Sequence, residues 1–283
     1  MKELTDTMLM EDMRSRLEFF EKELLAELDK YRGYQLYKPL MYAVSGGKRI
    51  RPLLLLLSFE CVGGKGDKPL PIAVAIELIH TQSLIHDDVI DHSKLRRKKP
   101  SFYMRYGNDT ALLSSDFVLA MVLDIISKCE KNRIIAEELA KASLKMCEGE
   151  LEEVKHQSNG IDRETYIRIL ENKTASLFEV SAKLGAILGE GDEEEVQALS
   201  EYGRLLGIAY QLIDDIVDGK IVAKNPELGA SNDLDSGINW MRKTALNYIE
   251  TAKRRLEVLK ESEAKHYLLK MPNLLIKNLT AKQ

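Results

Sequence analysis

The segment RETYIRILENKTASLFEVSAKLGAIL, residues 163–188, predicts the fold class of this chain. Its apolar side chains recur three and four residues apart, which is the spacing of one face of an α-helix. They are Ile167, Leu170, Leu177, Val180, Leu184 and Ile187. The segment lies within residues 101–225, which contain no proline and therefore no strong helix breaker. No run of alternating β-branched residues competes with this pattern, so the sequence predicts an all-α protein.

Outward from this segment, the same spacing and intervening turn residues predict a series of long helices. We expect them at residues 8–30, 36–45, 50–62, 70–94, 108–129, 132–158, 162–189, 193–221 and 238–280, the last in one or two pieces. The helices over 70–94 and 193–221 are apolar around most of their circumference, which is typical of helices in the middle of a bundle. No linker-like composition interrupts the chain, so residues 1–283 are predicted to form a single domain.

Composition narrows the classes of function. The 283 residues are 45% hydrophobic and 30% charged, as in an ordinary globular protein. The net charge of -4 gives no overall attraction for nucleic acid or an anionic membrane surface. Three cysteines cannot form a complete disulfide framework, and neither an export signal nor an apolar run of about 18 residues is found. We expect a cytoplasmic protein that binds no nucleic acid and does not span a membrane.

Two aspartate clusters end two of the apolar helices. LIHDDVID at residues 84–91 is echoed by LIDDIVD at residues 212–218. In each cluster the first and last aspartates are four residues apart, so their carboxylates project from one helix face. Like charges at this spacing destabilise a helix unless a cation neutralises them, and carboxylate oxygens suit Mg²⁺. If the two helices face each other, they form a magnesium-binding mouth, and the alternative is a pair of solvated acidic helix ends. The predicted metal ligands are Asp87, Asp88, Asp91, Asp214, Asp215 and Asp218.

Basic side chains suited to phosphate accompany the clusters. GGKRIRP at residues 46–52 places Lys48 and Arg51 three residues apart at a helix start, where backbone N–H groups also favour an anion. His80 lies two helical turns before the first cluster on the same face. The run LRRKK at residues 95–99 follows that cluster and predicts an arginine clamp for phosphate. Polar residues that interrupt apolar helix faces add three weaker candidates, Lys173, Thr174 and Gln211.

Together these motifs resemble those of the trans-isoprenyl diphosphate synthases, or polyprenyl synthetases. From about residue 36 to 218 the chain carries GGKRIRP, ELIHTQSLIHDDVID, a double arginine, ENKTASLF and GIAYQLIDDIVD in that family's order. The resemblance implies a bundle of long helices around a deep apolar cavity, usually in a homodimer. It also implies a prenyltransferase that uses three Mg²⁺ ions to join isopentenyl diphosphate to dimethylallyl, geranyl or farnesyl diphosphate.

The resemblance assigns a role to each candidate residue. It implies that Asp87, Asp91 and Asp214 hold magnesium on the allylic diphosphate, with Asp88, Asp215 and Asp218 in support. It matches Lys48, Arg51, His80 and Arg97 to positions that bind isopentenyl diphosphate. It matches Arg96, Lys173, Thr174 and Gln211 to positions that face the allylic substrate. The residues expected to act in catalysis are Asp87, Asp91, Asp214, Arg96 and Lys173.

The implied reaction lengthens the allylic chain by one isoprene unit. Cations stabilise the departing diphosphate, and the double bond of isopentenyl diphosphate attacks the allylic cation in a cavity that excludes water. Loss of a proton, to the released diphosphate in this family, then gives the longer product. Gln82 and Ser83, five and four residues before the first cluster, are not aromatic. Farnesyl-producing members of the family commonly carry bulky aromatic residues there. A C20 product, geranylgeranyl diphosphate, is therefore expected.

The chain departs from the family pattern after residue 218. The family usually continues with a GKDLxxGKxT-like segment, but residues 228–240 read LGASNDLDSGINW, with asparagine and isoleucine where lysines are expected. This region is predicted to be shortened, with Lys220 or Lys224 as replacement cations. Each lost charge-assisted contact is worth about 1.5 to 3 kcal/mol, enough to lower activity. Lys98, Glu150 and Tyr210 also replace a usual glycine, glutamine and phenylalanine.

Two alternatives compete with an active synthase. A noncatalytic or regulatory subunit of a heteromeric synthase fits the altered segment after residue 218. However, a noncatalytic subunit would have no physical reason to keep six like-charged aspartates at a cavity mouth. A terpene cyclase shares the DDxxD pattern, but it would have no use for GGKRIRP, and its second metal motif is of a different type. An active prenyltransferase is therefore the favoured hypothesis.

Overall fold

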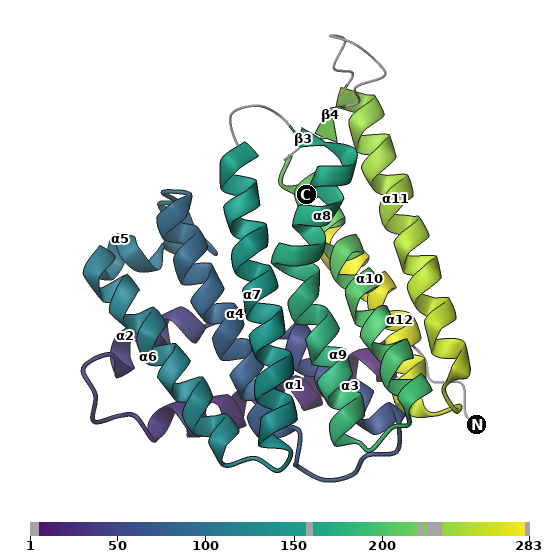
Figure 1. Cartoon of the computed structure of the whole chain (residues 1–283), viewed down its shortest axis with the longest axis horizontal. Helices are drawn as coiled ribbons and strands as arrows, with labels where there is room; N and C mark the ends of the chain where they lie inside the picture. Colours follow the sequence, from purple (N-terminus) through teal and green to yellow (C-terminus); the bar gives the residue numbers. More distant parts are fainter. Residues whose placement is uncertain (1–5, 157–160, 220–222, 225–233, 281–283) are drawn as a thin grey trace. The chain divides into compact units, whose positions relative to one another are not determined.

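The computed structural model describes residues 6–156, 161–219, 223–224 and 234–280. They fall into two compact units. Unit 1 consists of Met1–Leu53 and Asp67–Ile135, and unit 2 consists of Leu54–Gly66 and Ala136–Gln283. Each unit is helical, so the predicted all-α class is confirmed (Figure 1). The single-domain organisation of residues 1–283 stays a prediction.

Unit 1 is arranged around α4. Its elements are α1 (Asp6–Asp29), α2 (Tyr37–Val44), the first turn of α3 (Ile50–Cys61), α4 (Leu70–Ile90), β1 (Leu95–Arg96), β2 (Lys99–Pro100), α5 (Phe102–Tyr106) and α6 (Asn108–Ser127). Helix α4 packs against α1, α2, α5 and α6, and most of its residues are buried. Its central place was predicted from its apolar circumference. Ile85 near its end packs with Phe102 and Ala111 in a small cluster that supports the first aspartate cluster.

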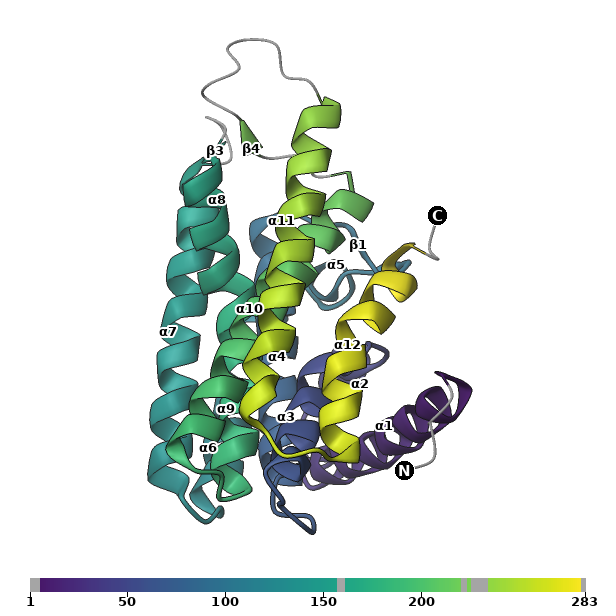
Figure 2. The same ribbon diagram turned by 90° about the vertical axis from the view of Figure 1, so that its right-hand side faces the viewer.

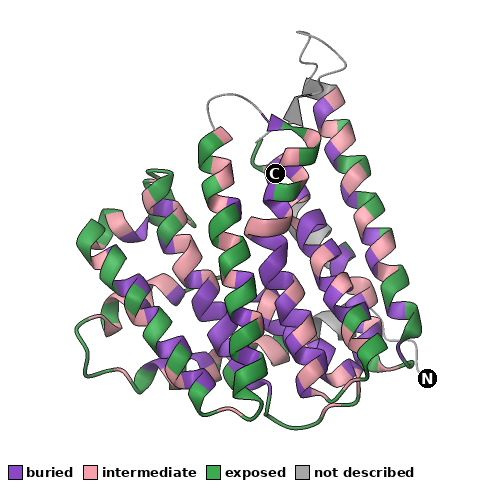
Figure 3. Cartoon of the chain, in the orientation of Figure 1, coloured by how far each residue is buried: buried purple, intermediate pink, exposed green. Residues whose placement is uncertain are grey.

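Unit 2 is arranged around α10. Its elements are the rest of α3, α7 (Asn132–His156), which begins in unit 1, β3 (Ile161–Asp162), α8 (Arg163–Leu170), a π-helix (Glu171–Ala175), α9 (Ser176–Leu188), α10 (Glu193–Val217), β4 (Ala223–Lys224), α11 (Leu234–Arg255), a 3₁₀ turn (Leu256–Val258) and α12 (Glu263–Thr280). Helix α10 packs along both α9 and α11 (Figure 2). Buried residues cover much of α9 and α10, whereas α7 presents many exposed ones (Figure 3).

Glycines and a cap fix the position of α10. Its first turn is closed by a capping box, in which the Asp192 side chain accepts from the Glu195 backbone N–H and the Glu195 side chain accepts from that of Asp192. A Cβ at Gly203 would lie 2.5 Å from the Phe178 carbonyl oxygen, so only glycine allows α10 to approach α9 this closely. Helix α10, which ends in the second aspartate cluster, is therefore packed closely against α9 at Gly203.

The structure differs from the predicted helices in three places. The helix predicted over 70–94 ends at Ile90, and residues 95–100 form a two-residue antiparallel hairpin, because the backbone turns at His92 with a left-handed φ of 52°. The helix predicted over 162–189 is interrupted by the π-helix. The segment predicted over 238–280 in one or two pieces forms two helices, in agreement with the prediction, and begins at Leu234. The short helix α5 was not predicted. Strands β3 and β4 pair in parallel, Ile161 with Ala223.

Candidate active site

The first aspartate cluster occupies the end of α4 in unit 1, and its three carboxylates have different surroundings. Asp88 is 1% exposed, whereas Asp87 is half-buried and Asp91 is exposed. The Arg96 Nε atom donates to Asp88 Oδ1 at 2.7 Å. Burial raises the pKa of Asp88 although Arg96 opposes this shift. Asp88 thus binds a protein cation, and the two outer aspartates are the more accessible pair.

Arg97 fastens the hairpin to the glycine loop at residues 45–47. Its Nη1 atom donates to the Ser45 carbonyl oxygen at 3.2 Å and also to the Gly46 carbonyl oxygen. Gly47 has a φ of 133°, and a Cβ there would lie 3.0 Å from Arg97 Nη2. Glycine is therefore required both by the backbone conformation and by the close approach of the guanidinium. The same contacts bring Arg97, a predicted diphosphate ligand, beside the loop that leads to Lys48.

Arg49 anchors the glycine loop at residues 45–47 through buried contacts, a role that the sequence analysis missed. The side chain is 3% exposed and forms ion pairs with Glu77 at 2.5 Å and with Glu21 at 2.6 Å. It also donates to the Val44 carbonyl oxygen. Glu77 is equally buried on the apolar helix α4, and a lone glutamate in that apolar run was the signal that could have revealed the pair. Lys48 and Arg51 flank the anchored residue.

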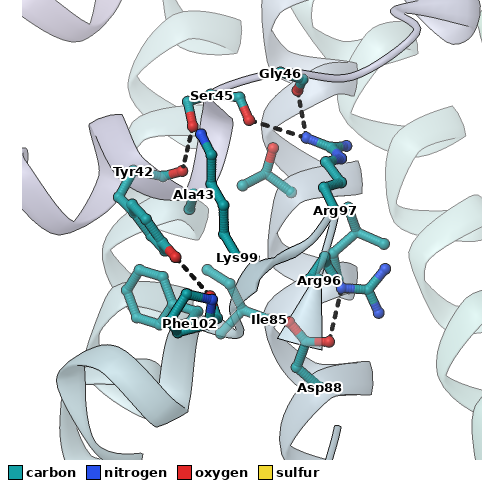
Figure 4. Close-up of a pocket in the computed structure, with 13 residues that line it drawn as sticks. Tyr42, Ala43, Ser45, Gly46, Ile85, Asp88, Arg96, Arg97, Lys99 and Phe102 are labelled. Atoms are coloured by element: carbon teal, nitrogen blue, oxygen red, sulfur yellow. Dashed lines mark hydrogen bonds and ion pairs between the residues drawn. The ribbon is translucent and has the colours of Figure 1, made fainter. Parts of the chain in front are cut away.

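A cavity of about 270 Å³ lies among these elements of unit 1 (Figure 4). Cations line it on the hairpin side, and aromatic and aliphatic side chains line the rest. Its lining includes Tyr42, Ile85, Phe102, Arg96, Arg97 and Lys99. Tyr42 donates its hydroxyl hydrogen to the Pro100 carbonyl oxygen at 2.5 Å, which holds α2 against the hairpin. Such a lining suits an anion that carries a small apolar group. Lys99 was not among the predicted site residues.

His80 lies half-buried on α4 within the field of the arginines of unit 1. Burial lowers the pKa of His80 well below its ordinary value, and Arg51, Arg97, Arg96 and Arg49 lower it further. The ring is therefore neutral at pH 7 and can accept as well as donate a hydrogen bond. Gln82 and Ser83 follow on the same helix, both half-buried, and the Ser83 hydroxyl donates to the His80 carbonyl oxygen at 2.9 Å.

The second aspartate cluster occupies the end of α10 in unit 2 and repeats the pattern of the first. Asp215 is 7% exposed, and both of its oxygens accept hydrogen bonds, from the Tyr166 hydroxyl at 2.5 Å and from Gln211 Nε2 at 2.9 Å. The Thr174 hydroxyl donates to Gln211 Oε1 at 3.1 Å. Asp214 is half-buried and Asp218 exposed. Three predicted residues are thus brought together, and Tyr166 joins them as a residue that the sequence analysis missed.

Lys173 lies in the π-helix and contacts two carboxylates of α7. Its Nζ atom is 2.5 Å from Glu150 Oε2 and 2.5 Å from Glu153 Oε2. A Cβ at Gly149 would lie 2.5 Å from the Lys173 backbone nitrogen, so α7 and the π-helix are in close contact at this point. A π-helix inside a longer helical run is frequent at functional sites. The lysine predicted to face the allylic substrate is therefore held in an acidic environment.

The aspartate carboxylates suit a magnesium ion that is held partly by the protein and partly by the phosphate groups of a substrate. Among the residues that the structure describes, no three acidic, histidine or cysteine side chains gather at one point. Mg²⁺ held by one or two carboxylates needs no such group, because water and phosphate oxygens complete its octahedral shell. In each cluster the two outer aspartates, four residues apart at the end of a helix, provide that pair.

The altered segment after residue 218 is described only in part. Lys220 and residues 225–233 lie outside the described residues, and Lys224 is described as part of β4 only. Ile238, one of the two residues found where lysines were expected, is half-buried on α11. The predicted replacement of lost cations by Lys220 or Lys224 stays a prediction.

Known proteins match this chain over almost its whole length. The family model described as polyprenyl synthetase matches residues 34–271. A geranylgeranyl diphosphate synthase of Methanosarcina mazei is 30% identical, over 95% of this chain and 97% of that protein. A geranylfarnesyl diphosphate synthase of the same organism is 34% identical, over 80% of each. The crystal structure of a geranylgeranyl pyrophosphate synthetase from Pyrococcus horikoshii superposes with a TM-score of 0.87 at 28% identity, over 95% of this chain and 98% of that one.

Proposed function

Because the chain belongs to the polyprenyl synthetase family and is a trans-prenyltransferase, we propose that it joins isopentenyl diphosphate to an allylic diphosphate and releases mainly geranylgeranyl diphosphate. The observation that carries the proposal is the matching geometry of the two aspartate clusters. In each one the middle aspartate is buried and held by protein donors, and the two outer aspartates are more accessible. A merely solvated acidic helix end would not need a buried, hydrogen-bonded carboxylate at its centre.

The outer aspartates are the proposed magnesium ligands. They are Asp87 and Asp91 in unit 1, and Asp214 and Asp218 in unit 2. Bound Mg²⁺ supplies positive charge to the diphosphate as it leaves the allylic carbon. Asp88 and Asp215 keep the ends of α4 and α10 in place through Arg96, Tyr166 and Gln211.

The basic side chains of unit 1 are the proposed site for isopentenyl diphosphate. Lys48 and Arg51 flank the anchored Arg49, Arg97 lies against the glycine loop, and the neutral ring of His80 adds a hydrogen-bonding group. The apolar part of the cavity beside the hairpin, with Ile85 and Phe102, excludes water from the reacting carbons. Arg96 and Lys173, with Thr174 and Gln211, are the proposed contacts of the allylic substrate.

The test is a product assay on the purified chain. It is incubated with Mg²⁺, labelled isopentenyl diphosphate and, in parallel, dimethylallyl, geranyl and farnesyl diphosphates, and products are separated by chromatography. Labelled C20 product that disappears with EDTA and in Asp87→Ala, but not in Asp109→Ala, is expected. Asp109 is an exposed aspartate in the first turn of α6 and controls for loss of a surface charge. No turnover with any primer would contradict the proposal and favour a noncatalytic subunit.

The chain length of the product is a separate prediction. Gln82 is half-buried on α4, one turn before Asp87, where a larger side chain would shorten the space for a growing prenyl tail. Gln82→Phe is expected to shift the main product from C20 to C15, as read by chromatography. Gln82→Leu, which is apolar and reaches less far than glutamine, is the matched control and should leave the product at C20. An unchanged product in Gln82→Phe would show that this position does not limit the tail.

The proposed assembly is a cytoplasmic homodimer that binds no nucleic acid. Helix α6 is long and apolar enough to cross a membrane by length and composition alone, a test that helices of soluble proteins also pass. Three of its four exposed leucines, Leu112, Leu119 and Leu123, are spaced at i, i+7 and i+11 and therefore form one apolar stripe. Contact with the same stripe on a second copy would remove it from water. The three cysteines are free in the structure.

A further inference from the structure

Lys173, Glu150 and Glu153 form an ion triad in unit 2 that carries more negative than positive charge. Both glutamates belong to α7, and the lysine belongs to the π-helix that α7 touches at Gly149. The two Nζ to oxygen distances are 2.5 Å. The charges sum to one net negative charge, at a residue that the proposed function assigns to binding an anion. The net negative charge of the triad opposes anion binding by Lys173, unless the triad itself has a function.

The two glutamates differ in how far they depend on the lysine. The Glu153 side chain is 37% exposed, so water solvates its carboxylate. The Glu150 side chain is 15% exposed, and both of its oxygens are buried. Neither oxygen accepts a hydrogen bond of acceptable geometry among the described residues, although Lys173 Nζ approaches one of them. The ammonium group of Lys173 therefore provides the main compensation for the buried charge of Glu150.

A buried carboxylate that loses its cation is strongly destabilised. If Lys173 leaves Glu150 to contact a diphosphate, the Glu150 carboxylate stays buried without its cation. The free-energy cost of that state makes substrate binding less favourable. A glutamine at this position would have no net charge to uncover. The lysine is thus restrained in the substrate-free protein by a residue that need not touch the substrate.

We propose that Glu150 is a positioning residue that competes with the allylic diphosphate for Lys173 and so weakens binding of that substrate. The inference rests on the proposed function, since it takes Lys173 as a ligand of the allylic diphosphate. This competition selects against weakly charged anions, because only a ligand with high negative charge density displaces the Glu150 carboxylate from the Lys173 ammonium group. A monophosphate should therefore compete poorly with the allylic diphosphate.

The first experiment measures KM separately for geranyl diphosphate and for isopentenyl diphosphate. Glu150→Gln is expected to lower KM for geranyl diphosphate about three- to tenfold and to leave KM for isopentenyl diphosphate within about twofold. The matched control is Glu152→Gln, which removes the same charge from the same turn of α7, at a carboxylate that pairs with Arg168 instead. It should change neither KM. An unchanged or raised KM for geranyl diphosphate in Glu150→Gln would overturn the inference.

The second experiment tests whether the effect passes through Lys173. In a double-mutant cycle, Glu150→Gln should have no effect on KM for geranyl diphosphate once Lys173→Gln is present. An equal change in both backgrounds would mean that Glu150 acts through its long-range field, and the inference would be wrong. If Glu150→Gln does not fold, Glu153→Gln should lower the same KM, by a smaller factor because Glu153 is more exposed.

A binding measurement separates this inference from the proposed function. Inorganic diphosphate with Mg²⁺ is titrated into the wild-type chain and into Glu150→Gln in a calorimeter. Tighter binding in the variant, together with no turnover by the wild-type chain, would support the triad and refute the synthase. Turnover by the wild-type chain, together with equal binding of diphosphate to the wild type and to Glu150→Gln, would support the synthase and refute the role of the triad.

Discussion

Individual residues show which parts of the site a sequence motif can predict. The motifs named Asp88, Asp215, Gln211 and Thr174, whose roles stay predictions, and the structure adds the hydrogen-bond partners that hold them. Tyr166 and Arg49 escaped prediction because each acts through a partner far away in the sequence. A pattern read along one chain reports spacing within a helix, whereas such pairs depend on how helices pack.

His80 makes a prediction about pH at this scale. Its pKa in the folded protein is lowered, first by burial and then by the arginines, below the value of about 6.5 in an unfolded chain. The unfolded chain therefore takes up the proton first as pH falls, and the free energy of unfolding should decrease below about pH 6.5. The decrease from this one group is at most about 1.4 kcal/mol per pH unit.

The measurement is urea unfolding of the wild-type chain and of His80→Gln between pH 7.5 and 5.5. The variant should lose less free energy of unfolding over this range, since glutamine does not titrate. Comparing the two chains cancels the carboxylates that they share. Parallel pH profiles would show that His80 is protonated as readily in the folded protein as in the unfolded one.

Helices and their contacts form the next scale. Here the sequence predicted the lengths of the helical runs well, but it did not predict where a run is interrupted. The helical run predicted over 162–189 is confirmed in length, but its centre is a π-helix, in which the Ser176 N–H donates to the Glu171 carbonyl oxygen five residues earlier. Apolar residues spaced three or four apart fit either form, because one added residue leaves the spacing on each side of it unchanged. The hairpin after α4 was not predicted either, because the basic run at residues 95–99 has no alternating pattern that indicates strands.

Close helix contacts in unit 2 give a prediction about stability. Gly185 of α9 faces α3, and a Cβ there would lie 2.3 Å from the Leu55 carbonyl oxygen and 2.8 Å from Ser58 Cβ. Gly185→Ala must therefore push the two helices apart and should lower the free energy of unfolding by about 1 to 3 kcal/mol.

The matched control is Gly33→Ala, because a Cβ at Gly33 meets nothing within 4 Å. Its free energy of unfolding should stay the same or rise slightly, as the unfolded chain loses freedom. Urea unfolding of the three chains under one condition decides the matter. Equal stability of the Gly185 variant and the wild type would mean that α9 and α3 adjust without strain.

For the whole molecule, the apolar spacing and the long proline-free stretch predicted an all-α chain, and the structure confirms this. The division into two compact units could not be foreseen, because no change of composition marks their boundaries and α3 and α7 each contribute to both. The assembly of copies is equally hidden in the sequence. An apolar helix looks the same whether its exposed stripe meets its own chain or another.

The leucine stripe of α6 predicts the mass of the assembly. Each chain has a mass of 32.1 kDa, and analytical ultracentrifugation of the wild type should give about twice this value. Leu112→Glu combined with Leu119→Glu places two carboxylates on the stripe and should give monomers. Leu246→Glu, at a similarly exposed leucine of α11, is the control and should stay dimeric. A monomeric wild type, or a double variant of unchanged mass, would contradict the proposed homodimer.

The π-helix also limits how the length of this part of the chain can change. Each residue in a helix turns the backbone by about 100°, so removing one residue between Glu171 and Ala175 would permit regular α-helical hydrogen bonds. The same deletion would rotate α8 relative to α9, so that Tyr166 and Phe178 could no longer keep their present partners on α10 together. A loop can gain or lose a residue with little effect, but this helical segment cannot, and related sequences that keep the site should align through it without gaps.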